Sequence, residues 1–347
     1  MKQCAMITSL GLLVLAVGCS TPELKLDPTL KTYSRAELED MDEIELPANY
    51  SVENFKKLQM GVAFEVLPGV DKKTGEALSI DPNLSTRLQT EMAKLKRFTI
   101  FSAHNRGGVT FFQELGDVDD QVQLQEASDV KAIDLVLSGK VTVTKERQDR
   151  YNDTLIIYEV ECDFSCEDMK TRTVKFAEKA KGRTARKVLL SFSGRKMAGF
   201  DDKDEQQAIM QASMKALAVV ANKLGNTYPV GGRVTGITGS GERMTMQAGF
   251  EEGIGKNQQC VIFVDDEGVD VPIALAEAAP KNNGTSTLSI YRWAESTDAK
   301  PLVRELRENG RSFAKNNKVY AVGYGLPVPP EWDNAYKGSM DEQKRLK

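Results

Sequence analysis

The stretch from Asp153 to Phe164, DTLIIYEVECDF, constrains the fold of this chain more than any other feature. Side chains two residues apart lie on the same face of a strand, so Tyr158, Val160 and Cys162 share one face. The acidic side chains that alternate with them share the other face. One apolar and one charged face are typical of a half-buried antiparallel strand. The stretch therefore predicts a sheet that buries one face.

Further strands and helices are predicted around this strand. Short apolar runs at 60–66, 98–103 and 133–146 predict strands. Helices are predicted after Asp81, across 119–132 and before Gly225. Their apolar positions are Leu84, Leu88, Met92 and Leu95 in the first helix, and Met210, Met214, Leu217, Ala221 and Leu224 in the last. We therefore expect an α/β (α+β) domain over residues 54–226, with a mixed sheet flanked by helices.

The pattern changes after residue 228. Short strands separated by Gly and Asn-Gly turn signals fill residues 229–325, interrupted by one helix at 301–309. This arrangement predicts a small all-β SH3-like barrel domain. The remaining residues, 326–347, are rich in proline and then in charge, and we expect them to be disordered or extended.

The chain begins with an apolar run, residues 5–17, that is too short for a spanning helix and suits a secretory signal. Leu15, Ala16, Val17 and Gly18 precede Cys19 and resemble a bacterial lipobox, with Ala16 where Leu is usual. The resemblance implies a signal peptide at 1–18 and a lipid on Cys19, and Ser20 implies the outer membrane. A plain signal peptide is the alternative. Residues 19–53, Pro-spaced and acidic, are expected to form a tether.

The charge composition argues against one class of partner. With 46 basic and 50 acidic residues, the net charge is −4, which gives no case for nucleic acid. After cleavage and lipidation, Cys162, Cys166 and Cys260 remain. An extended strand would hold Cys162 and Cys166 about 13 Å apart, beyond disulfide reach, unless the chain bends at Ser165. Free buried thiols are favoured slightly.

The α/β segment resembles a known family. The phrases AIDLVLSGKV (132–141) and YEVECDFSCEDMKTRTV (158–174) are similar to the CsgG-like family of bacterial envelope lipoproteins. That family includes the curli secretion channel, activators of peptidoglycan synthases and the flagellar protein FlgT. Thr171-Arg172 stands where the family commonly has a Thr-Gly turn. The resemblance covers about residues 54–226, and the barrel segment resembles the small C-terminal barrel of FlgT. Only the lipid attachment site, Cys19, carries over from the family.

No motif points to catalysis. GITGSGER (236–243) lacks the Lys-Ser/Thr of a phosphate-binding loop and favours a hairpin turn. His104 is the only histidine, with no nucleophile motif beside it. The spacing of the carboxylates marks no acid–base pair, and the cysteines fit no zinc pattern. We expect no enzyme activity, no metal and no cofactor beyond the lipid.

Residues 170–187 contain eight Lys or Arg and one Glu. One interpretation is the solvated face of a hairpin, and the other is a contact for an anionic partner. The candidate contact residues are Lys170, Arg172, Lys175, Lys179, Arg183 and Arg186. These charges also argue against a pore-forming hairpin, because Lys or Arg facing mid-bilayer lipid costs about 2–4 kcal/mol.

The sequence therefore predicts a lipoprotein anchored on the periplasmic face of the outer membrane. It would act as a non-catalytic accessory or scaffold for an envelope assembly machine, through a periplasmic or outer-membrane protein partner. The alternative is a ring-forming secretion or curli-type channel component. Homo-oligomerisation stays open.

Overall fold

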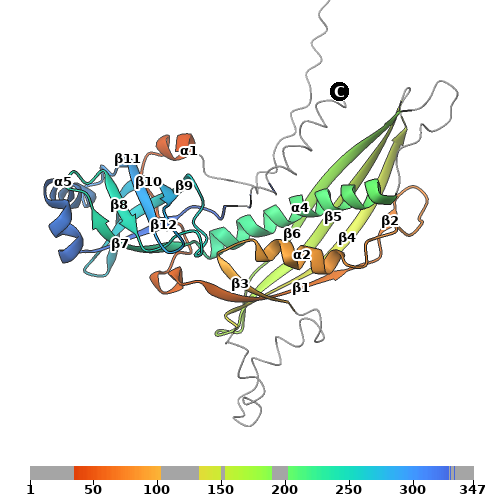
Figure 1. Ribbon diagram of the computed structural model, residues 1–347, viewed down its shortest axis with the longest axis horizontal. Helices are drawn as coiled ribbons and strands as arrows, with labels where there is room; N and C mark the ends of the chain where they lie inside the picture. Colours follow the sequence, from red (N-terminus) through yellow and green to blue (C-terminus); the bar gives the residue numbers. More distant parts are fainter. Residues whose placement is uncertain are drawn as a thin grey trace, which may run out of the picture.

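The computed structural model describes residues 35–102, 133–149, 153–189 and 202–327, together with Pro329 and Trp332. These residues form an α/β unit and a β-barrel that lie side by side along the long axis (Figure 1). Cys19, His104 and the helix predicted at 119–132 lie outside the described residues.

The α/β unit contains one mixed sheet with the strand order β3-β1-β4-β5-β6. Strand β1 runs parallel to β3 and β4, whereas β4, β5 and β6 are antiparallel. The two-residue strand β2 pairs with β4. The bounds are β1 Leu58–Val66, β2 Val70–Asp71, β3 Phe98–Ser102, β4 Leu135–Asp149, β5 Asp153–Asp168 and β6 Thr173–Leu189. The predicted mixed sheet is confirmed, and residues 173–189 form one continuous strand.

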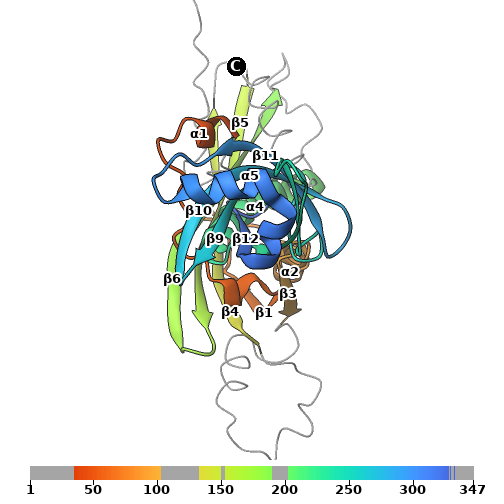
Figure 2. The same ribbon diagram turned by 90° about the vertical axis from the view of Figure 1, so that its left-hand side faces the viewer.

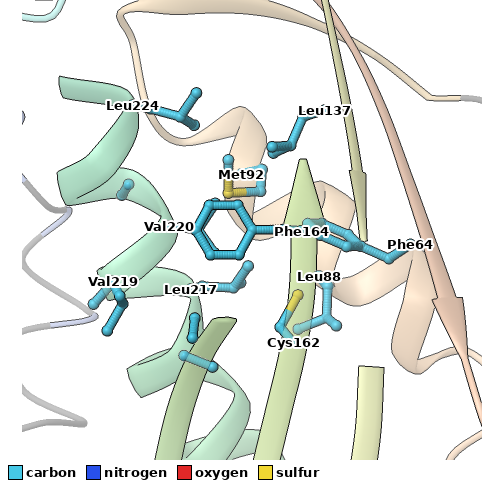
Figure 3. Close-up of a cluster of buried hydrophobic side chains, with 14 of the residues drawn as sticks. Phe64, Leu88, Met92, Leu137, Cys162, Phe164, Leu217, Val219, Val220 and Leu224 are labelled. Atoms are coloured by element: carbon cyan, nitrogen blue, oxygen red, sulfur yellow. The ribbon is translucent and has the colours of Figure 1, made fainter. Parts of the chain in front are cut away.

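Helices α2 (Leu84–Ala93) and α4 (Asp202–Thr227) cover one face of this sheet (Figure 1). The predicted apolar face of β5 is confirmed, because Val160, Cys162 and Phe164 are buried beneath the helices. Figure 3 shows Phe164 between Leu217 and Val220 of α4 and Met92 of α2. The opposite side of the sheet, here called the open face, carries the acidic side chains of β5.

Helix α4 lies unusually close to strand β6. A Cβ atom placed on Gly182 would lie 1.8 Å from the carbonyl oxygen of Ala212 and 2.7 Å from the amide nitrogen of Ala216. Ala208, Ala212 and Ala216, at i, i+4 and i+8, give the helix a face of small residues that permits this approach. The helix ends at Thr227, two residues beyond Gly225, and Met210 lies only partly in the core.

The barrel is closed and antiparallel, in the order β10-β11-β8-β7-β12-β9. Its strands are β7 Gly231–Ile237, β8 Arg243–Met246, β9 Gln258–Asp266, β10 Val269–Pro280, β11 Ser286–Trp293 and β12 Lys318–Gly323. Helix α5 (Ala299–Asn316) lies against the barrel end nearest the viewer in Figure 2 and buries Val303, Leu306 and Phe313. GITGSGER forms the β7–β8 turn, where the Thr238 amide donates to the Arg243 carbonyl. The predicted small barrel is confirmed.

Two segments expected to be unstructured contain packed residues. Residues 35–55, within and just beyond the expected tether, include α1 (Arg35–Glu39) and a 3-10 helix, η1 (Val52–Phe55), and lie against the barrel. In the expected tail, Leu326 and Trp332 are buried in the core of the α/β unit. Both segments contain large apolar side chains, and burying these removes apolar surface from water.

Candidate interaction surfaces

The basic residues of β6 lie opposite the acidic residues of β5 on the open face. The register pairs Lys181 with Glu161, Lys179 with Asp163 and Arg183 with Glu159. The Lys181 Nζ to Glu161 Oε2 distance is 2.6 Å, and Lys179 Nζ lies 2.9 Å from Glu161 Oε1 and 3.0 Å from Asp163 Oδ1. Arg183 Nε reaches Glu159 Oε2 at 3.9 Å. We call these six residues the charge ladder.

The charges of the ladder stabilise one another. Hydrogen bonds from Lys181 and Lys179 lower the pKa of Glu161 below its usual range, and the same carboxylate raises the pKa of Lys179. Three basic groups face three acidic groups, so the ladder has no net charge. Opposite charges directly across a strand pair favour the pairing, whereas like charges oppose it.

The other basic candidates are separated from the ladder. Lys170 and Arg172 lie in the β5–β6 turn, where Asp168 accepts hydrogen bonds from the amides of Lys170 and Thr171. Arg172 has a φ of 54°, in the left-handed region that favours glycine. Lys170 reaches Asp134 and Lys175 reaches Asp168. Arg186 donates to Gln211 of α4, on the opposite side of the sheet from the ladder. The six residues therefore form no single basic surface.

We expect neutralising the basic side of the ladder to leave anionic-membrane binding unchanged. The test is the unlipidated chain carrying Lys179→Gln, Lys181→Gln and Arg183→Gln, sedimented with vesicles containing anionic lipid. The fractions of parent chain and variant that sediment with the vesicles should agree within twofold, because the acidic residues of β5 already compensate these cations. A tenfold loss of retention in the variant would instead show that the basic strand contacts anions.

A shallow hollow of about 750 Å³ lies on the open face beside the ladder. Four small residues of adjacent strands lie in register across it: Ala63, Ser138, Ser165 and Ala177. The hydroxyl oxygens of Ser138 and Ser165 are 2.9 Å apart. The next row, which includes Lys140 and Asp163, is charged. The hollow follows from this change in side-chain size across the sheet.

Residues 35–55 are bound to the outside of the barrel, and we call them the N-terminal strap. Leu38 is fully buried in a cluster with Val261, Phe263 and Leu275 of the barrel. The Tyr50 ring meets the Phe263 ring edge-on, with centroids 5.3 Å apart. Aromatic side chains on the outer barrel surface are therefore covered by the chain's own N-terminal part.

Polar contacts fix the strap at several points. The Arg292 guanidinium of β11 donates to the carbonyls of Leu38, Glu39 and Asp42, the first at 2.9 Å, where α1 ends. A cation at a helix C-terminus also interacts favourably with the helix dipole. The Tyr50 hydroxyl donates to Asp270, and burial together with this hydrogen bond raises the Tyr50 pKa. The strap is thus specifically docked.

The two units meet around Arg97, which is fully buried. Its guanidinium donates to the backbone carbonyls of Lys56 at 2.7 Å and Tyr228 at 3.1 Å, and also to those of Asn54 and Pro229. Asn54 lies in the strap, Lys56 directly follows it, and Tyr228 and Pro229 lie in the link between α4 and β7. Burial lowers the Arg97 pKa to about 10, so the side chain stays charged at neutral pH. Sequence reasoning did not identify Arg97, because nothing local distinguishes it from other arginines.

The three described cysteines are free and buried, as the sequence favoured. Burial raises the pKa of Cys162, Cys166 and Cys260 to about 12. Thiolate is the reactive form, so these groups are poor nucleophiles at neutral pH. Within the described residues, no group of three or more His, Cys, Asp or Glu side chains could hold a metal ion, and no helix is long and apolar enough to cross a membrane.

No protein-family model matches this chain, and no curated protein matches it. Several solved structures are similar. A hypothetical protein of Chlamydia trachomatis is 10% identical, with a TM-score of 0.26, over 50% of this chain and 98% of its own. A Neisseria meningitidis lipoprotein is 14% identical, with a TM-score of 0.21, over 49% and 99%. A Helicobacter pylori homologue of a neuraminyllactose-binding hemagglutinin is 13% identical, with a TM-score of 0.26, over 47% and 80%. All three TM-scores are below 0.5, so these similarities carry no functional information.

Proposed function

We propose that this protein is anchored by a lipid on Cys19 to the periplasmic face of the bacterial outer membrane. It acts by binding an envelope protein partner and not by catalysis. The lipobox-like sequence supports the anchor, and the resemblance of residues 54–226 to CsgG-like lipoproteins supports the compartment. The inert thiols and the mutually paired charges of the sheet support binding over chemistry.

The observation that carries the proposal is the docking of the N-terminal strap on the barrel. Sixteen residue steps separate Cys19 from Arg35, where α1 begins. A chain extends by at most about 3.6 Å per residue, so these steps span at most about 58 Å. A lipid on Cys19 would therefore keep Arg35, and the barrel on which the strap is docked, within about 58 Å of the membrane surface.

Replacing Cys19 by Ser is expected to release the protein from the membrane. The variant cannot take a thioether-linked lipid, and the described residues contain no spanning helix to replace it. Cell fractionation should find the parent chain in the outer-membrane fraction and Cys19→Ser outside it. Cys4→Ser is the matched control, because Cys4 lies within the proposed signal peptide and should not affect retention. Retention of Cys19→Ser in the outer membrane would contradict the anchor.

Mass in detergent distinguishes this proposal from the ring-forming alternative. Strands β5 and β6 belong to the packed sheet, and one face of this sheet lies under α4. We therefore expect light scattering on a sizing column to give a monomer or dimer. A single assembly of many subunits would support a ring and would contradict an accessory that acts as a monomer or dimer.

A further inference from the structure

Trp332 lies beyond the last barrel strand, yet its side chain is inserted between the helices of the other unit. Only 2% of its surface is exposed, and it belongs to the core cluster that contains Leu88 and Met92 of α2 and Leu217 of α4. The groove between α2 and α4 thus binds an indole.

The indole is held by a directed hydrogen bond as well as by burial. Its Nε1–H donates to Oε2 of Glu91 on α2 at 2.9 Å. The other carboxylate oxygen of Glu91 is 2.8 Å from Lys94 Nζ, so the acceptor is fixed by an ion pair one turn further along the helix. Hydrogen bonds to a charged acceptor are about twice as strong as neutral ones. Phe in the same position would lack this donor.

The groove is not filled by Trp332. A hollow of about 570 Å³ continues beside the indole. Besides Trp332, its lining includes Gln207, Met210, Gln211 and Met214 of α4. Unbranched Met side chains adapt to ligands of different shape, and they are common on surfaces that bind more than one sequence. The hollow leaves space for residues that flank an indole.

Leu326 and Pro327, which precede Trp332 in the chain, make their contacts near the joint of the two units. Leu326 lies so close to Gly225 that a Cβ atom there would be 2.4 Å from the Leu326 Cβ. Likewise, a Cβ atom on Gly255 of the barrel would lie 2.4 Å from the Pro327 Cγ. Within the described residues, Trp332 is therefore the one side chain of this segment anchored in the groove. Displacing the Trp332 side chain would break none of the contacts that Leu326 and Pro327 make with Gly225 and Gly255.

We propose that the groove between α2 and α4 is a binding site for a tryptophan-bearing peptide segment of a partner protein, and that Trp332 occupies it in the free chain. The Trp332 indole acts as an internal competitor. A tethered group has an effective concentration of the order of mM. A partner segment must therefore compete with an indole that is present at about this concentration beside the groove. The inference rests on the proposal that the protein acts by binding a partner, and it does not depend on the lipid.

The test is a titration of the purified full chain with a peptide of residues 327–336, PVPPEWDNAY. The Trp332→Ala variant should bind this peptide, and the parent chain should bind it at least tenfold more weakly because the groove is occupied. A peptide with Ala in place of Trp should not bind the variant, and one with Phe should bind about tenfold more weakly than the Trp peptide. Adding Glu91→Ala to Trp332→Ala should weaken binding of the Trp peptide by a similar factor.

Folding is checked by circular dichroism and thermal melting. If Trp332→Ala does not fold, Trp332→Phe replaces it, since Phe fills part of the groove but donates no hydrogen bond to Glu91. A folded variant that binds neither peptide, or that binds the Trp and Ala peptides equally, would show that Trp332 only stabilises the fold. Because the titration uses purified protein, its failure would not bear on membrane retention of the Cys19→Ser variant.

Discussion

Replacing Gly182 by alanine is expected to lower the melting temperature of the α/β unit by about 6–12 °C. The new Cβ would lie 1.8 Å from the Ala212 carbonyl oxygen, a separation that two non-bonded atoms cannot adopt. Backbone lies on both sides of this contact, so no side-chain rotation relieves it. Helix α4 must move away from β6, which loosens its packing across the sheet. Overpacking a core typically costs 1–3 kcal/mol and occasionally more; we expect about 3 kcal/mol here.

Gly236→Ala is the matched control for this prediction. Gly236 also lies in a strand, β7, but its added Cβ would lie 3.6 Å from Thr245 Oγ1, an ordinary contact distance. We expect this variant to melt within about 2 °C of the parent chain, because strands tolerate a side chain where there is space. Equal melting temperatures for the two variants would show that α4 does not lie against β6 as described. Thermal melting followed by far-UV circular dichroism makes both measurements.

The elements of both units follow closely from the sequence, and the reason is periodicity. Alternation in 133–146 and 153–164 marks β4 and β5, and the 4-4-3 spacing from Leu84 to Leu95 marks α2. These signals are local, so reading them requires no knowledge of the rest of the molecule. Strand β6 gives a weaker local signal, because charged residues on its open face interrupt the apolar alternation.

Contacts between distant segments could not be predicted in this way. The basic stretch 170–187 left open a solvated hairpin face or a contact for an anionic partner, and the structure pairs four of its residues with acids on β5. The acidic side of β5 was visible in the sequence, and the hairpin register that joins the two sides could have indicated the pairing. The N-terminal strap, Arg97 and Trp332 have no comparable signal. Each depends on partners more than 40 residues away, which no local pattern specifies.

Replacing Arg97 by methionine is expected to destabilise the joint between the two units more than any exposed arginine substitution. Methionine matches the length of the aliphatic stem but donates no hydrogen bonds. The carbonyls of Lys56, Tyr228 and Asn54 would lose their donor. An unsatisfied buried polar group costs about 1–3 kcal/mol, which applies in full to the buried Tyr228 carbonyl and in part to the part-buried Lys56 and Asn54 carbonyls, so we expect a total loss of about 3 kcal/mol. Losing the buried charge offsets part of this cost, because burial already disfavours the charged form.

Two variants separate charge from geometry at this joint. Arg97→Lys keeps the charge, but an ammonium cannot reproduce the planar fork that reaches carbonyls of two separate chain segments, so we expect an intermediate loss. Arg87→Met is the matched control, because Arg87 is half exposed and its ion pair with Asp81 contributes at most about 1 kcal/mol. Limited proteolysis should show faster cleavage between α4 and β7 in Arg97→Met, since opening of the joint exposes that link. If Arg97→Met and Arg87→Met melt alike and are cleaved alike, the joint is held by backbone packing, such as that of Gly253 against Arg97 and of Leu326 against Gly225, and the buried guanidinium is dispensable.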